Sequence, residues 1–230
     1  LKKNWSVHKR HDRLGDEFAL TKMVAYACER VGIASMPVFQ KPEQSGLINA
    51  NTDPVALIAG QDVVKGMAQR EMTFRVAKAA TLMRPDFYLA SAYPTTDYLK
   101  VFFYAAFASV TNQVLDPANQ DAIVRYAHEI ADMPAPERTR INNTIQMMTQ
   151  QGMNPDLSAW LREVDHTANR VGLLLSGDLR AAVASVKDEK LWVGKASVKD
   201  KVKELILFNI SDEYFELRRQ MGFNLERRRQ

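Results

Sequence analysis

Three short apolar segments, set between long helical stretches, constrain the fold of this chain most strongly. They occupy residues 36–39, 46–50 and 55–60, and Pro, Gly, Asn and Asp residues interrupt the sequence between them. Short apolar runs bounded by such residues are typical of β-strands joined by turns. We therefore expect a small three-stranded sheet in the N-terminal third of the chain.

Helical periodicity dominates the remaining sequence. An amphipathic pattern covers residues 16–31 and stops at Gly32, and a short helix after Gly60 is separated from a long apolar helix by a break near Met67. The long helix begins at Gln69 and ends before Pro85. Further helices are expected over residues 97–110, 119–132, 137–151, 156–186 with a break at 177–178, 198–208 and 212–221.

This order of elements predicts an α+β fold that is mainly α-helical, with the small sheet packed on a helical bundle. We expect a single domain over residues 16–222, between a basic N-terminal segment (1–15) and a basic C-terminal tail (223–230). Because the sequence begins at Leu1 rather than Met, we expect it to be part of a longer chain.

Composition excludes several classes of protein. The 230 residues are 46% hydrophobic and 25% charged, which is ordinary for a soluble globular protein. No stretch approaches the roughly 18 apolar residues that a membrane span needs. The single cysteine, Cys28, precludes an internal disulfide, lies in an apolar helical run as a buried thiol would, and fits a reducing, cytoplasmic location.

The net charge of +4 reflects basic residues at the two ends of the chain. We interpret these residues as solvated tails; binding of nucleic acid or an anionic surface is the alternative, and it predicts a steep dependence on salt. Few aromatic residues interleave them, so a base-stacking platform is not indicated. The basic residues concerned are Lys2, Lys3, Lys9, Arg10 and Arg13 at the start, and Arg227, Arg228 and Arg229 at the finish.

Four segments in a fixed order resemble a known family. They are SGLINA at 45–50, PVALIAG at 54–60, the helix from REM at 70–72 to Leu82, and DHTANRVGL at 165–173. Together they resemble the gluzincin metallopeptidases that include the CAAX prenyl endopeptidase and the HtpX heat-shock peptidase. The resemblance covers roughly residues 16–185 and implies a zincin-like domain.

The family's zinc helix bears the motif HExxH, in which two histidines one helical turn apart bind zinc and the glutamate takes a proton from metal-bound water. Counting seven residues from Glu71, as the family's spacing implies, places Lys78 at the first histidine position. Ala79 then stands at the glutamate position and Leu82 at the second histidine position. The resemblance therefore implies that both imidazoles and the general base are missing.

The later helix of the family supplies a third, glutamate ligand and an aspartate one turn on. Asp165 falls at the glutamate position and Asn169 at the aspartate position. One carboxylate alone would bind zinc too weakly to hold a catalytic ion, so we expect neither a metal nor another cofactor and no peptidase activity. The resemblance implies a non-catalytic interaction or scaffold module with a protein or peptide partner of unknown identity.

Two interpretations of Lys78 stay open at this point. Its ammonium could occupy the vacated metal position and pair with Asp165, because a buried charge requires a partner. Alternatively, Lys78 reaches solvent along its apolar stem, and the segment 69–83 is an ordinary buried helix.

A different kind of enzyme is the competing hypothesis. His128, Glu129 and Asp132 form a motif similar to HExxH with a carboxylate at its end, just before Pro134, and a solvated helix end is the simpler interpretation. His166 adjoins Asp165, but adjacent side chains diverge around a helix. His8 and His11 lie in the basic N-terminal segment.

Overall fold

The computed structural model describes residues 12–189 and 193–223. Contacts between residues divide the chain into two compact units. Unit 1 combines the N-terminal part up to Ala92 with the C-terminal part from Arg162, and unit 2 comprises Tyr93–Leu161. The single domain expected over residues 16–222 stays a prediction, and the two units are compact parts of the chain. The basic residues of the ends, apart from Arg13, lie outside the described residues.

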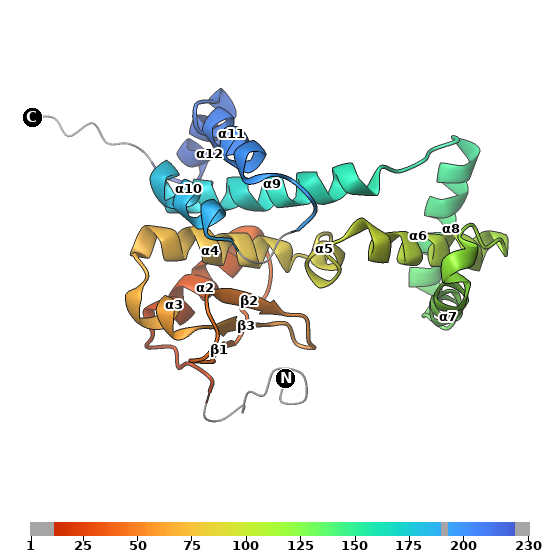
Figure 1. Cartoon of the computed structure of the whole chain (residues 1–230), viewed down its shortest axis with the longest axis horizontal. Coiled ribbons are helices and arrows are strands. Elements are labelled where there is room, and N and C mark those ends of the chain that lie inside the picture. Colours follow the sequence, from red (N-terminus) through yellow and green to blue (C-terminus); the bar gives the residue numbers. More distant parts are fainter. Residues whose placement is uncertain (1–11, 190–192, 224–230) are drawn as a thin grey trace, which may run out of the picture. The chain divides into compact units, whose positions relative to one another are not determined.

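The expected sheet is present in unit 1. Strands β1 (Val38–Gln40), β2 (Leu47–Ala50) and β3 (Ala56–Ala59) lie in the order β1-β3-β2, as Figure 1 shows in the lower part of the unit. The central strand β3 is parallel to β1 and antiparallel to β2. Every residue of β3 is buried, which explains its unbroken apolar sequence.

The helices of unit 1 confirm the predicted pattern. The first ends at Gly32, whose φ of 75° is a left-handed conformation that favours glycine. The short helix α5 is the one that sequence analysis does not predict, since five residues give no period to detect. The helices are α2 (Ala19–Val31), α3 (Gln61–Gly66), α4 (Gln69–Leu82), α5 (Tyr88–Ala92), α10 (Leu179–Lys187), α11 (Val198–Asn209), α12 (Asp212–Gln220) and α9 (Leu157–Ser176), which belongs to unit 1 from Arg162 onward.

The main core of unit 1 packs α2 and α4 against the sheet. Val24 and Val76 are fully buried in it, beside Leu57 from β3. Cys28 belongs to the same core as predicted, and burial raises the pKa of its thiol. A second apolar cluster joins Phe74 of α4 to the C-terminal helices.

Unit 2 contains three complete α-helices, one 3₁₀ turn and the first residues of α9. It has an apolar core of its own, in which Ala105 and Ile123 are fully buried. This core is separate from those of unit 1, in agreement with the division of the chain into two units. No helix in the described part of either unit is long and apolar enough to span a bilayer. The elements are α6 (Thr96–Thr111), η1 (Pro117–Asn119), α7 (Gln120–Ala131) and α8 (Ala135–Gln150).

Helices α4 and α9 lie side by side and antiparallel (Figure 1). Near one end, the Arg70 guanidinium donates to the carbonyl oxygen of Ser176 at 2.6 Å. One turn further along α4, the ring of Phe74 lies against Gly172 of α9. A Cβ added at Gly172 would come within 2.8 Å of that ring and 3.0 Å of the Phe74 carbonyl oxygen. Glycine therefore allows the close approach of these two helices.

We predict that Gly172→Ala destabilises the protein. Alanine normally stabilises a helix interior by up to about 1 kcal/mol relative to glycine, but here the added methyl overpacks against Phe74, so we expect a net loss of roughly 1–3 kcal/mol. Urea denaturation measures this difference. Gly66→Ala is the matched control, because a Cβ there meets nothing within 4 Å. A stabilised Gly172→Ala variant would contradict the proposed close approach.

Candidate functional site

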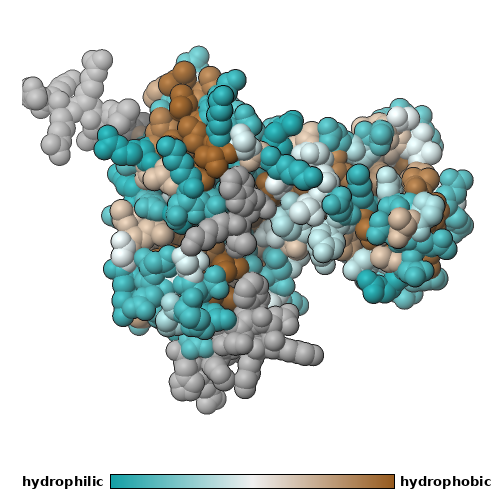
Figure 2. Space-filling model, viewed as in Figure 1, coloured by the Kyte–Doolittle hydropathy of each residue, from teal (hydrophilic) through white to brown (hydrophobic). Residues whose placement is uncertain are grey.

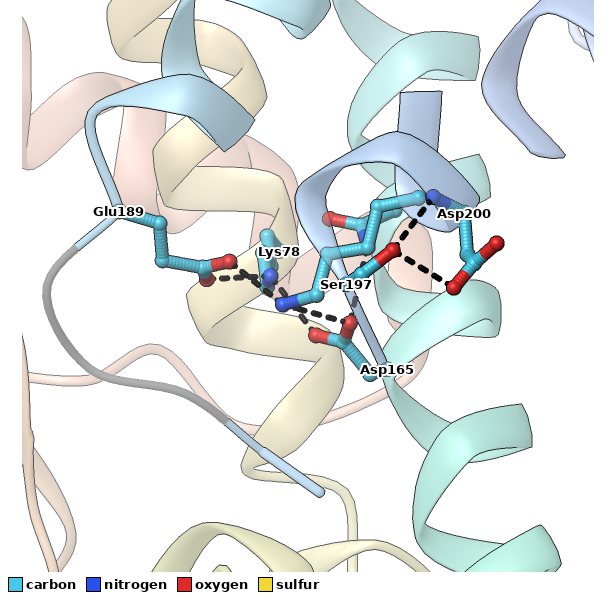
Figure 3. Close-up of polar contacts among 7 residues, drawn as sticks. Lys78, Asp165, Glu189, Ser197 and Asp200 are labelled. Carbon is cyan, nitrogen blue, oxygen red and sulfur yellow. Dashed lines mark hydrogen bonds and ion pairs between the residues drawn. The ribbon is translucent and has the colours of Figure 1, made fainter. Parts of the chain in front are cut away.

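Four charged side chains from separate segments of unit 1 meet beside α4. Lys78 comes from α4, Asp165 from α9 and Lys201 from α11, and Glu189 follows the end of α10. Figure 3 shows Lys78, Asp165 and Glu189 directed toward one another across the space between these elements. We call this group the ion-pair cluster.

The ion-pair cluster is a closed ring of alternating charge. The Lys78 Nζ lies 2.8 Å from Asp165 Oδ1 and also pairs with Glu189 Oε1. The Lys201 Nζ lies 2.9 Å from both Asp165 Oδ2 and Glu189 Oε2. Each ammonium thus contacts both carboxylates, and the two positive charges balance the two negative ones.

The cluster is buried, which makes its pairing obligatory. The side chains of Lys201 and Asp165 are fully buried, and those of Lys78 and Glu189 are 9% and 15% exposed. Burial alone would raise the pKa of Asp165, but the attraction of Lys78 and Lys201 outweighs it and holds that pKa below its usual value. Burial likewise acts to lower the pKa of Lys201, and the attraction of Asp165 and Glu189 raises it instead.

Local sequence explains how Lys201 reaches the cluster. Ser197 precedes α11, and its hydroxyl oxygen accepts a hydrogen bond from the backbone N–H of Asp200 while donating to the Asp200 carboxylate at 2.6 Å (Figure 3). This capping arrangement fixes the first turn of α11. Lys201 then shares the buried face of the helix with Leu205 and Phe208, at positions i, i+4 and i+7.

A second set of charges holds the segment that carries Glu189. Arg75, one turn before Lys78 on α4, contacts Glu71 at 2.6 Å and Asp188 at 2.9 Å. The adjacent carboxylates of Asp188 and Glu189 therefore bind Arg75 and Lys78, two cations on α4. This pairing anchors the end of α10 to α4.

The structure brings together three of the five residues that the resemblance singles out. Lys78 and Asp165 form the ion pair described above, and Asn169 donates from Nδ2 to Asp165 Oδ2 at 3.3 Å. The hypothesis that Lys78 pairs with Asp165 is thus confirmed, and the alternative that Lys78 reaches solvent is wrong.

The other two singled-out residues, Ala79 and Leu82, lie on α4 and are buried. The side chain of Asn49, from the Asn-Ala pair of β2, donates to the carbonyl oxygen of Ala79 at 3.3 Å. The edge strand β2 and α4 therefore meet at Ala79.

Lys201 and Glu189 are not among the residues expected from the sequence. Lys201 lies in a run of alternating charges that is typical of a solvated helix, and only its spacing from Leu205 and Phe208 could have indicated a buried face. Glu189 lies beyond the end of α10, where no periodicity constrains the direction of a side chain. Its pairing with Lys78 depends on the tertiary fold alone.

The alternative metal motif lies elsewhere. His128, Glu129 and Asp132 are all exposed, in unit 2. His166 is half-buried on α9, and His8 and His11 fall outside the described residues. Among residues 12–189 and 193–223, no three His, Cys, Asp or Glu side chains are grouped as metal ligands would be.

A pocket of about 340 Å³ in unit 1 lies apart from the ion-pair cluster, since none of the four clustered residues lines it. Its wall is mostly apolar, with two arginines. The lining residues are Arg30, Val31, Thr81, Arg84, Phe87, Thr167, Val171, Leu174, Leu175 and Met221.

The electrostatics limit what the cluster can do chemically. A nucleophilic or basic lysine needs a lowered pKa, whereas the pKa of Lys201 is raised. An acid catalyst needs a protonated carboxyl group near neutral pH, whereas the pKa of Asp165 is lowered. These two groups are therefore suited to holding helices together rather than to transferring protons.

Comparison with protein-family models, with curated proteins and with solved structures finds no match to this chain.

We predict that Lys201→Met lowers the free energy of unfolding by roughly 3–5 kcal/mol at pH 7, because two buried carboxylates then share one ammonium. Denaturant titration measures the loss. The matched control is Lys195→Met, an exposed lysine nearby, for which we expect a change within about 0.5 kcal/mol.

The pH dependence of this loss separates charge from packing. Because the folded-state pKa of Asp165 is lowered, its contribution to stability is present above the unfolded-state pKa and is lost as the pH falls through the folded-state pKa. The deficit of Lys201→Met should therefore shrink below about pH 4. A deficit that is independent of pH would show that the loss of stability does not come from the charge of Lys201.

Proposed function

We propose that this chain is a non-catalytic relative of the gluzincin metallopeptidases that works by binding a protein or peptide. The observation that supports this proposal best is the Lys78–Asp165 ion pair. Its two members occupy the positions that the resemblance assigns to the first zinc-binding histidine and to the carboxylate ligand. Under this proposal, a cation of the protein itself replaces the metal cation of the family.

Charge balance supports the same interpretation. A zinc ion brings two positive charges to a site that contains one carboxylate ligand in the His₂Glu class. In this chain the ammonium groups of Lys78 and Lys201 bring the same total positive charge, and a second carboxylate, Glu189, shares it with Asp165. Without them Asp165 would be a buried, unpaired anion, which costs several kcal/mol. The lysines would therefore preserve the packing of α4 on α9 after the metal was lost.

The side chain at position 79 cannot accept a proton, which supports the proposed lack of peptidase activity. Ala79 contributes only a methyl group, and its carbonyl oxygen accepts from Asn49. A water molecule near this turn of α4 would find neither a Lewis acid among the singled-out side chains nor a carboxylate at the family's position. Hydrolysis by the family's mechanism is not expected.

The edge strand β2 offers a place for an extended peptide. β3 covers one side of β2, and Gly60 donates its N–H to the carbonyl oxygen of Gly46 at 2.9 Å. Hydrogen-bonded and non-hydrogen-bonded pairs alternate in an antiparallel ladder. The backbone groups of Leu47 and Asn49 therefore face away from β3, where an added strand could bind them.

We predict that zinc binding can be restored by replacing the lysines. The variant with Lys78→His, Leu82→His, Asp165→Glu and Lys201→Met places two imidazoles one turn apart opposite a carboxylate, and should retain about one zinc ion per chain after desalting. Metal analysis by mass spectrometry measures this, with circular dichroism to establish folding. The native chain should retain far less.

The matched control is the same variant with Lys201 kept, which should bind zinc more weakly because the ammonium repels the ion. A folded variant without zinc would argue against a zincin-like geometry. Stoichiometric zinc in the native chain, lost on His128→Ala, would favour the competing metal-enzyme hypothesis.

The binding role can be tested at the β2 edge. Peptides selected by display against the native protein should lose affinity by at least about tenfold for Leu47→Pro, because proline removes an N–H from the free edge. Fluorescence polarisation measures the affinity, and Leu47→Val is the control that keeps the N–H. Equal affinities of a folded Leu47→Pro variant would rule out strand addition at this edge.

A further inference from the structure

An exposed apolar surface covers the α11–α12 hairpin. Its four large side chains are 43–67% exposed, although they lie within a stretch of only ten residues. Figure 2 shows the corresponding hydrophobic area over α11 and α12 at the top of the view. We call it the apolar patch; it consists of Ile206, Leu207, Ile210 and Phe215.

The packing of unit 1 does not explain these residues. The buried face of α11 is formed by Lys201, Leu205 and Phe208, which belong to the ion-pair cluster and the second apolar cluster. Ile206 and Ile210 lie on another face of the chain, one turn apart. Contiguous exposed apolar residues of this kind mark interaction sites in folded proteins.

Charges of opposite sign flank the apolar patch. On the N-terminal side, Lys199 and Lys203 are exposed at helical spacing before Ile206 and Leu207. On the C-terminal side, Asp212 and Glu213 are exposed in the first turn of α12. Asp200 is also exposed between these lysines, with its carboxylate bonded to Ser197, so the surface runs from a net basic end through the apolar patch to an acidic end.

Such a surface is complementary to itself under a two-fold rotation. When a second copy is turned so that its α11 runs antiparallel, apolar patch faces apolar patch, and the basic end of each copy faces the acidic end of the other. A membrane surface or a uniformly charged partner would match only one of the two ends.

We propose that the apolar patch is the contact surface of a symmetric homodimer, in which Lys199 and Lys203 of one copy face Asp212 and Glu213 of the other. Four half-exposed side chains cover a few hundred Å² at most, which is less than the roughly 800 Å² that each partner contributes to a stable interface. The dimer is therefore weak and depends on concentration.

Sedimentation velocity of the native protein over a wide range of concentrations tests the proposal. The native chain should shift from monomer to dimer, and Leu207→Asp with Ile210→Asp should stay monomeric at every concentration. Leu89→Asp is the matched control, since Leu89 is 45% exposed on α5, outside the apolar patch, and it should dimerise like the native chain. A native protein that remains monomeric throughout would overturn the proposal.

Charge reversal tests the two-fold geometry itself. Lys203→Glu and Glu213→Lys should each weaken self-association by about tenfold or more, because each creates two like-charge contacts in the dimer. An equimolar mixture of the two variants should associate again, since every contact between unlike copies is then between opposite charges. Failure of the mixture to associate, with both variants folded, would exclude this arrangement.

Discussion

The ion pairs that surround Asp165 impose the strictest condition on this fold. Asp165 is fully buried, and a buried carboxylate is tolerated only when cations and hydrogen bonds compensate for the lost hydration. Lys78 and Lys201 meet this condition from two different helices, and Glu189 completes the charge balance. The relative placement of α4, α9, α10 and α11 therefore follows from one electrostatic requirement together with the apolar packing around it.

Local features of the fold could be predicted from sequence because their causes are local. The strands near Ile48 and Ile58 are short apolar runs between turn residues, and Gly32 ends its helix with a conformation that other residues rarely adopt. The division into two units could not be predicted in this way, since the helices around Ile123 have the same period as those of unit 1. Only contacts between helices reveal that they enclose a separate core.

The candidate site was predictable in part for a related reason. The resemblance to the metallopeptidases singles out Lys78 and Asp165 by their positions on two helices. In addition, a lysine inside an apolar helix needs an anion nearby. Lys201 and Glu189 approach from segments whose sequences look solvated, so their burial is a property of the tertiary structure. The proposed function rests on the geometry of this cluster and on that resemblance.

The order of the segments along the chain has a consequence for biosynthesis. Unit 1 is interrupted by unit 2, so α4 leaves the ribosome long before the segment that carries Asp165 and later Lys201. During that interval Lys78 has no carboxylate from the later segments to bind, and Phe74 lacks the apolar side chains of the C-terminal helices. Unit 1 can complete its folding only after the last helices have been translated. Until then the nascent chain exposes hydrophobic surface of the kind that chaperones bind.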